Sequence, residues 1–156
     1  MDAYSIVKTI HVLSAAVLFG TGLGIAAFML WGMISPEPVV RRFAAAATVR
    51  ADLVFTLPAV IVQPLSGAWL VWRAGLDPTD KWLAITYGLY LLAGACWLPV
   101  VAIQIRLKRL LSREAAGEPV DRRVVRRLFR WWFALGWPAF GGLVVVFFLM
   151  VAKPTW

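Results

Sequence analysis

Four long apolar runs restrict the fold of this sequence more than any other feature. They cover about residues 5–31, 53–72, 82–105 and 131–152. Each is long enough to cross a bilayer, which takes about 20 mostly apolar residues in a helix. Only helices and closed barrels satisfy every backbone group in lipid, and these runs lack the alternation of barrel strands. We therefore predict an all-α integral membrane protein, a four-helix bundle made of one domain over residues 1–156.

The composition supports a membrane protein and excludes several kinds of site. Hydrophobic residues make up 62% of the 156 residues and charged residues only 15%, against roughly 45–50% and about 25% in soluble domains. The single cysteine, Cys96, excludes an internal disulfide and any multi-cysteine zinc or iron–sulfur site. The single histidine, His11, excludes a bis-histidine metal or haem site within one chain.

The basic residues predict the orientation of the bundle. Twelve of the sixteen lysines and arginines lie in the two connections between the first and second and between the third and fourth runs. The four on the opposite side are Lys8, Arg73, Lys81 and Lys153. Because basic loops favour the cytoplasm, both termini should face the outer, periplasmic side of a bacterial inner membrane. Topology and contact with anionic lipid thus explain the net charge of +8, and we expect no nucleic-acid partner.

Two segments beside the spans are expected to be helical. Residues 121–130 carry an apolar face and five arginines, and Asp121 is placed to cap their first turn. We predict a short amphipathic helix there, lying on the inner leaflet before the fourth span. Residues 39–51 are expected to form a helix that leads into the second span. Tryptophans are expected at the two membrane interfaces, outside at Trp69, Trp72, Trp82 and Trp156, and inside at Trp31, Trp131 and Trp132.

Small residues and prolines suggest how the spans pack. Gly20 and Gly24 form a G-x-x-x-G pattern in the first span, and Gly141 and Gly142 lie in the fourth. Such glycines let helices approach closely, and we expect a homo-oligomer as one use of them. Prolines inside the spans are expected to kink them and open a cavity, at Pro58, Pro64, Pro99 and Pro138.

Polar residues inside the spans are the candidates for a functional site, because ionisable groups are costly in hydrocarbon. Lys8 and His11 share one face of the first span, at i and i+3. The imidazole is suited to be an axial metal ligand or a proton carrier; an interfacial structural histidine beside a snorkelling lysine is the alternative. Depth along the spans allows one outer-half pocket formed by Lys8, His11, Gln63, Tyr90 and Lys153.

Two further interpretations concern polar residues within or beside the spans. Gln63 is followed by Pro64, so its amide has an alternative use in bonding a backbone group that the proline frees. At the inner ends of the second and third spans, we expect interfacial pairs among Arg50, Asp52, Gln104 and Arg106. Known nucleotide-binding and hydrolase motifs are missing, and no pair of buried carboxylates offers general acid and base. Whether the protein is an enzyme is left open.

The sequence resembles a bacterial family of predicted integral membrane proteins of unknown function. The likeness is carried by the opening from Lys8 through His11 to Ser14, followed by Gly20-Thr21-Gly22. More distantly, the chain is similar to the CopD-like superfamily, which includes the HemJ-type protoporphyrinogen oxidases. There too the first span opens with lysine and histidine at i and i+3, and a Lys-Pro pair follows the last span, as Lys153-Pro154 does here.

The resemblance implies a b-type haem, or a porphyrin-like cofactor, and a redox role. His11 would then be the iron ligand, Lys8 and Lys153 would pair with the propionates, and Gln63 and Tyr90 would donate hydrogen bonds around the site. Two other functions stay open from the residues alone. One is a transporter or channel-like subunit for a small solute or metal ion. The other is a non-catalytic structural partner in the membrane.

Overall fold

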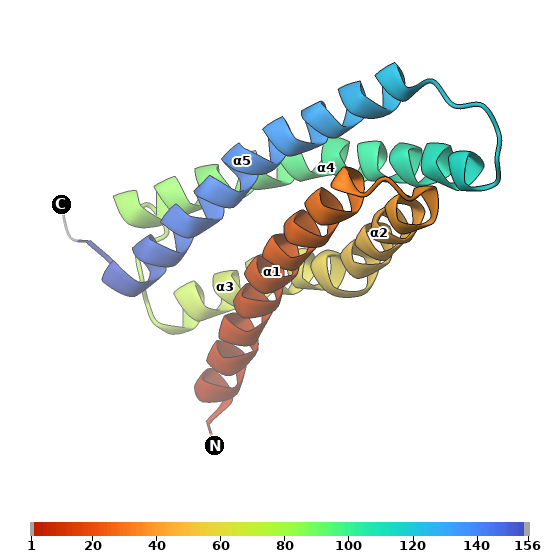
Figure 1. Ribbon diagram of the computed structural model, residues 1–156. Helices are drawn as coiled ribbons and strands as arrows, with labels where there is room; N and C mark the ends of the chain where they lie inside the picture. Colours follow the sequence, from red (N-terminus) through yellow and green to blue (C-terminus); the bar gives the residue numbers. More distant parts are fainter. Residues whose placement is uncertain (1, 155–156) are drawn as a thin grey trace.

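The computed structural model describes residues 2–154, and within them the chain is helical with short connections (Figure 1). The elements are α1 (Ala3–Ile34), α2 (Pro38–Ala51), the π-helical turn η1 (Asp52–Thr56), α3 (Leu57–Arg73), α4 (Lys81–Ala115) and α5 (Arg122–Ala152). α2, η1 and α3 follow one another without a break. The described part of the chain therefore contains four helical stretches long and apolar enough to cross a membrane. This confirms the predicted all-α, four-span fold.

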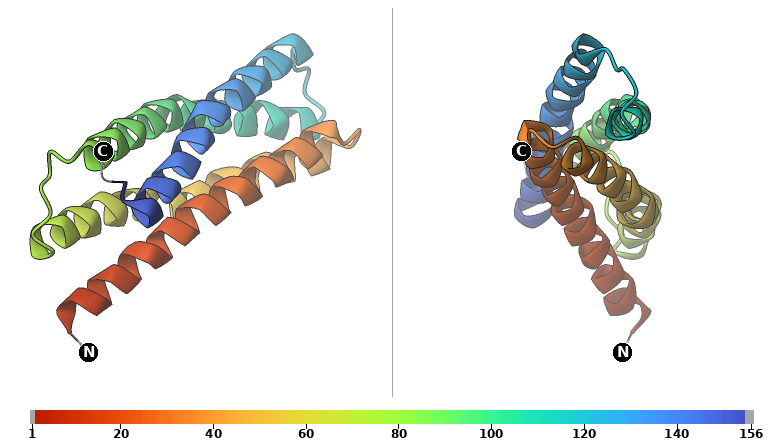
Figure 2. Two further views of the ribbon diagram at one scale, coloured as in Figure 1. Left: turned by 90° about the vertical axis from the view of Figure 1, so that its left-hand side faces the viewer. Right: turned by 45° about the vertical axis from the view of Figure 1, so that its right-hand side comes forward.

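The four spans run up and down between two ends of the molecule. Both termini and the connection between α3 and α4 lie at one end, which we call the terminal end (Figures 1 and 2). The connections from α1 to α2 and from α4 to α5 lie at the other, which we call the basic end because it carries most of the arginines. The termini thus share a side, as predicted. Which side faces the cytoplasm stays a prediction from the charge distribution.

The helices pack as two hairpins joined through α2. α4 packs along α5, α1 packs against α2 and α3, and α2 packs against α4, whereas α1 and α5 make few contacts, among them those of the Phe19 ring with Phe140 and Phe147. The main apolar core lies toward the basic end, where Met29, Leu107 and Leu111 are fully inaccessible to solvent. A smaller cluster of Trp82, Leu83 and Leu149 lies toward the terminal end. Many large apolar side chains remain on the outer surface, where lipid would cover them.

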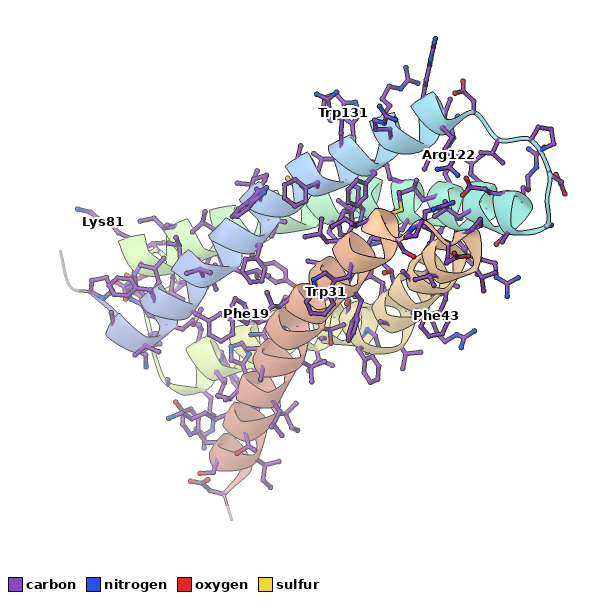
Figure 3. The ribbon with its side chains drawn as sticks, in the orientation of Figure 1. Phe19, Trp31, Phe43, Lys81, Arg122 and Trp131 are labelled. Carbon is purple, nitrogen blue, oxygen red and sulfur yellow. The ribbon has the colours of Figure 1, made fainter. Side chains whose placement is uncertain are left out.

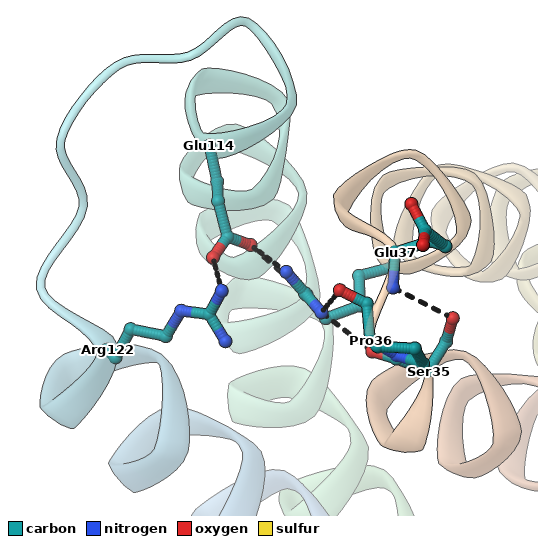
Figure 4. A network of polar contacts seen from close by, with 6 residues as sticks. Ser35, Pro36, Glu37, Glu114 and Arg122 are labelled. Atoms are coloured by element: carbon teal, nitrogen blue, oxygen red, sulfur yellow. Dashed lines mark hydrogen bonds and ion pairs between the residues drawn. The ribbon is translucent and has the colours of Figure 1, made fainter.

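A network of ion pairs and hydrogen bonds connects the helices at the basic end (Figure 4). Arg41 of α2 donates from Nη1 to the carbonyl oxygens of Ser35 and Pro36, at 2.6 and 2.8 Å. Its guanidinium also pairs with Glu114 Oε2, with Nη2 at 3.1 Å. The other oxygen of Glu114 lies 2.8 Å from Arg122 Nη2 at the start of α5. One carboxylate therefore joins the α1–α2 connection to the ends of α4 and α5.

The structure differs from the expectation for residues 121–130. Asp121 caps the helix as predicted, accepting a hydrogen bond from the Arg123 backbone amide at 2.8 Å. The segment is however not a separate interfacial helix, because α5 runs without interruption from Arg122 to Ala152. No proline or glycine occurs between Arg122 and Leu135, so no helix-breaking residue lies where the span begins.

The tryptophans only partly follow the expected belts. Trp31, Trp72 and Trp131 are exposed, and Figure 3 shows Trp131 pointing away from the bundle. Trp82 and Trp132 are instead buried, so the interpretation of these two as belt residues is wrong. Both face other helices, because a tryptophan near a span end joins the core when it lies on the inward face. Trp156 lies outside the described residues.

The glycines also differ in use from the expectation. No atom of another helix lies within 4 Å of a side chain built at Gly20, Gly24 or Gly141, so these glycines allow no close packing within the chain. Close approach occurs at Gly32, which meets Ala44, and at Gly142, where an added Cβ would lie 3.7 Å from the Leu89 carbonyl oxygen. Gly20, Gly22 and Gly24 of α1 therefore meet no other helix in the described part of the chain, and the homo-oligomer remains a prediction.

Candidate functional site

His11 lies in a compact polar cluster between α1 and α3, which we call the His11 cluster. Its Nδ1 is 2.8 Å from Ser66 Oγ, and its Nε2 is 3.3 Å from Gln63 Nε2. Ser14, one turn further along α1, donates to Gln63 Oε1. Beneath the ring, Gly67 leaves space that a side chain would fill, since a Cβ there would come within 3.1 Å of His11 Cε1. The structure thus brings together His11 and Gln63, two of the residues that depth along the spans allowed in one pocket.

The hydrogen bonds define the protonation of the imidazole. Because Ser14 donates to Gln63 Oε1, the Gln63 amide nitrogen faces the ring as a donor. In this arrangement His11 Nε2 accepts, and Nδ1 carries the proton and donates to Ser66 Oγ. The Ser66 hydroxyl in turn donates a hydrogen bond to the Val62 carbonyl oxygen at 2.6 Å. The neutral imidazole therefore has both ring nitrogens engaged by α3.

The other residues predicted for this pocket do not join the His11 cluster. Lys8 and Lys153 are exposed, and within residues 2–154 no hydrogen bond or ion pair connects either to His11. Tyr90 donates its hydroxyl to the Val60 carbonyl oxygen at 2.6 Å. Pro64 has no N–H, so it leaves that carbonyl without its usual helical partner. The freed backbone group predicted beside Pro64 is thus bonded by Tyr90, and Gln63 bonds Ser14 and His11 instead.

A second site lies deeper in the bundle, in a cavity of about 320 Å³ that we call the Asp52 cavity. Its walls come from α1, η1, α3, α4 and α5, and most of its lining is apolar or aromatic. Gly22 and Gly136 widen it, since a Cβ added at either glycine would find no atom of another helix within 4 Å. Tyr90 lines it near one end, and Asp52, Gln104 and Trp132 line it toward the basic end.

Buried polar atoms without partners mark the end of the cavity nearer the basic end. Asp52 is 5% exposed, Thr56 6% and Gln104 2%. Thr56, Gln104 and Trp97 surround the Asp52 carboxyl. Within residues 2–154, five buried polar atoms of the lining residues nevertheless lack a partner in hydrogen-bond geometry, namely Asp52 Oδ2, Thr56 Oγ1, Trp97 Nε1, Gln104 Oε1 and Trp132 Nε1. Unsatisfied buried polar atoms are few in native proteins, so five around one cavity indicate a place for a ligand or water.

The π-helical turn η1 explains why Asp52 and Thr56 reach this cavity together. The Leu57 amide bonds the Asp52 carbonyl five residues back, which widens the helix by one residue. Pro58 follows directly and supplies no N–H for the next helical bond. The turn keeps Asp52 and Thr56 on the inward face, and such π-turns are frequent at functional sites.

Of the interfacial pairs predicted near Asp52, the structure brings together Asp52 and Gln104 and contradicts the part played by the arginines. Asp52 and Gln104 are buried, while Arg50 and Arg106 are exposed and form no ion pair with Asp52 in the described part of the chain. The reason is geometric, because residues two apart on a helix point to nearly opposite sides. Sequence reasoning thus missed this site. The available signal was Asp52 with Thr56 at i+4, and Trp97 with Gln104 at i+7, each pair on one helix face.

Fold and site together define an integral membrane protein with four helical spans, a polar cluster between two helices and a cavity among the spans. The chain belongs to the family described as Predicted integral membrane protein (DUF2269), whose sequence profile matches residues 5–154. No curated protein and no solved structure matches the chain significantly. The family confirms the membrane class and the family of unknown function predicted from the sequence.

Proposed function

We propose that this protein binds a small, mostly hydrophobic molecule inside the membrane, in the Asp52 cavity. The observation that carries the proposal is the combination of an apolar cavity of about 320 Å³ with five unpartnered polar atoms, most of them toward one end. Ligand sites are typically apolar pockets of about 300–1,000 Å³ with a few convergent polar groups. An engineered apolar cavity of about 150 Å³ already binds benzene, so this one has room for a larger ligand.

The geometry favours holding or carrying the molecule across the membrane, which corresponds to the transporter class. Besides its apolar residues, the lining offers one carboxyl group, and the Tyr90 hydroxyl is already committed to the Val60 carbonyl. The cavity lies between α1 and the α4–α5 hairpin, and the ring of Phe19 on α1 stacks on Phe140, which lines the cavity. A molecule that enters from the bilayer between α1 and α5 must therefore displace these two rings.

Filling the cavity tests this proposal. Gly136→Leu places a side chain in the cavity, whereas Gly141→Leu adds the same side chain at an exposed position of the same helix. The probe is neopentylbenzene, a compact apolar molecule, and the measurement is the unfolding temperature of the purified protein in detergent. A bound ligand at 100 times its Kd stabilises by about 2.7 kcal/mol. We expect stabilisation of wild type and Gly141→Leu and none of Gly136→Leu. Equal responses of all three would contradict the cavity as binding site.

A b-type haem held by His11, with a redox role, is the function that the HemJ resemblance favours. The residues do not fit it as they stand, because Gln63 occupies His11 Nε2 and Ser66 occupies Nδ1. Lys8 and Lys153, proposed for the propionates, form no hydrogen bond or ion pair with this cluster in the described part of the chain. The absorption spectrum of protein expressed with a haem precursor tests it. A Soret band that is lost in His11→Ala would support haem, and a colourless folded protein would refute it.

Two partners predicted from the sequence also remain proposals. The arginines at the basic end are proposed to contact anionic lipid on the cytoplasmic face of a bacterial inner membrane. Gly20, Gly22 and Gly24, which meet no other helix in the described part of the chain, are proposed to pack against a second copy or another membrane protein. The second of these would also serve the structural-partner function that the sequence leaves open.

A further inference from the structure

The Asp52 cavity contains an acid and no base. Among its lining residues no lysine, arginine or histidine occurs, and no charged side chain acts on the Asp52 carboxyl. Its polar neighbours Thr56, Trp97 and Gln104 are neutral. An ionised carboxylate buried in a membrane protein normally pairs with a cation. The chain supplies none inside this cavity, so the partner must come from the ligand or from a proton.

The remaining lining suits a positive charge. Six aromatic side chains face the cavity, namely Tyr90, Trp97, Trp132, Phe133, Trp137 and Phe140. The faces of such rings attract cations, tryptophan most strongly, and the attraction grows when water is excluded. An anionic ligand such as a fatty acid would meet only the repulsion of Asp52. The charge of the lining therefore selects against anions and for cations.

We propose that the occupant of the Asp52 cavity is a lipophilic organic cation, an amine or quaternary ammonium compound. Its charged group lies at the Asp52 carboxylate, beside Thr56 and Gln104, and its apolar body extends between the aromatic rings toward Tyr90. The path from Gln104 to Tyr90 covers fourteen residues of α4, about 20 Å of helix at 1.5 Å per residue. This inference rests on the proposed function and names the chemical class of its ligand.

A proton competes with this cation for the same carboxylate. When a quaternary ammonium ion binds the protonated form, the O–H bond of Asp52 breaks, the proton passes to water, and one cation replaces one proton. Tyr90 is the other titratable group that lines the cavity, and Arg50 of α2 and Arg106 of α4 are exposed on the outer surface. Affinity should therefore rise with pH, by as much as tenfold per pH unit while the carboxyl is mostly protonated.

A pair of probes of the same shape tests the charge directly. Benzyltrimethylammonium and neopentylbenzene differ in that nitrogen with a positive charge replaces a neutral carbon. Binding of each to the purified full chain is measured by tryptophan fluorescence and by the unfolding temperature, between pH 5 and pH 8.5. Asp52→Asn removes the charge inside the cavity. Asp77→Asn removes the same charge from the exposed connection between α3 and α4 and is the matched control.

We expect the cation to bind wild type and Asp77→Asn at least about tenfold more tightly than the neutral probe, with one proton released per cation below the pH where Asp52 ionises. Asp52→Asn should lose this preference and the pH dependence. If the neutral probe binds as well as the cation, the inference is wrong while the proposed cavity function stands. If neither probe binds, both fail. If Asp52→Asn does not fold, the pH dependence and proton release of wild type decide alone.

Discussion

Removing the Glu114 carboxylate should destabilise the protein far more than removing the neighbouring carboxylate of Glu118. Glu114→Gln leaves Arg41 and Arg122 without their shared counter-charge. Glu118→Gln breaks an ion pair of similar length, 2.7 Å, formed with Arg113. The two acids lie four residues apart at the same end of the molecule, so the comparison isolates the effect of burial.

The exposure of the partners sets the expected magnitudes. The side chains of Arg41 and Glu114 are 5% and 12% exposed, and those of Arg113 and Glu118 are 56% and 51% exposed. Breaking a buried pair by removing one partner costs about 3–5 kcal/mol. Arg41 keeps two carbonyl acceptors, so we place the loss for Glu114→Gln at about 2–3 kcal/mol. The exposed pair should lose about 0–1 kcal/mol.

The free energy of unfolding is measured by titrating the purified protein from mild detergent into a denaturing detergent, with tryptophan fluorescence as signal. The double variant Arg41→Met with Glu114→Gln should be less destabilised than the sum of the two single variants, because it leaves one unpaired charge fewer. Equal losses for Glu114→Gln and Glu118→Gln would refute the reasoning, since burial would then contribute nothing.

Three further predictions concern other parts of the molecule. Reporter domains fused after Gly75 and after Arg113 should lie on opposite sides of the membrane, the latter in the cytoplasm; a periplasmic signal after Arg113 would reverse the orientation. Changing the four arginines within residues 122–127 to glutamine should reduce the stabilisation that anionic lipid gives in nanodiscs, and 1 M salt should reduce it in wild type; an unchanged lipid response would contradict a charge effect. His11→Ala removes two hydrogen bonds between α1 and α3 and should cost roughly 1–3 kcal/mol of unfolding free energy, while Thr9→Ala, whose hydroxyl bonds within α1, should cost little. Equal losses would show that the His11 cluster does not hold the helices together.

The spans were predictable because the bilayer imposes a length and an apolar composition on any helix that crosses it. The positions of α1, α3, α4 and α5 follow from that demand, and the cap at Asp121 follows from local hydrogen bonding. The continuity of α5 through Trp131 is harder to predict. The sequence changes there from a basic amphipathic segment to an apolar span, and this change suggests two separate helices. Helical hydrogen bonds pass across such a change of composition without interruption.

The functional residues were harder to predict, because the sequence does not state which faces meet. Depth along the spans brought His11 and Gln63 together correctly, since α1 and α3 run side by side. It gave Tyr90 the wrong neighbours, because Tyr90 lies on α4 and its hydroxyl bonds the Val60 carbonyl oxygen of α3 rather than His11. Asp52 was correctly placed with Gln104 but was also linked to Arg50 and Arg106, which point away from it, whereas its other neighbours are Thr56 and Trp97.

The division into two hairpins has a consequence for the order of synthesis and membrane insertion. The ribosome completes α1 to α3 before α4 and α5 exist, and these first spans already contain Asp52 and Thr56. The side chains that later surround the carboxyl, Gln104 and Trp97, arrive with α4, and α5 follows with Trp132. Until then Asp52 faces lipid or the translocation machinery. Nascent chains ending before α4 should therefore be retained there or degraded, and release into the bilayer should follow synthesis of the second hairpin.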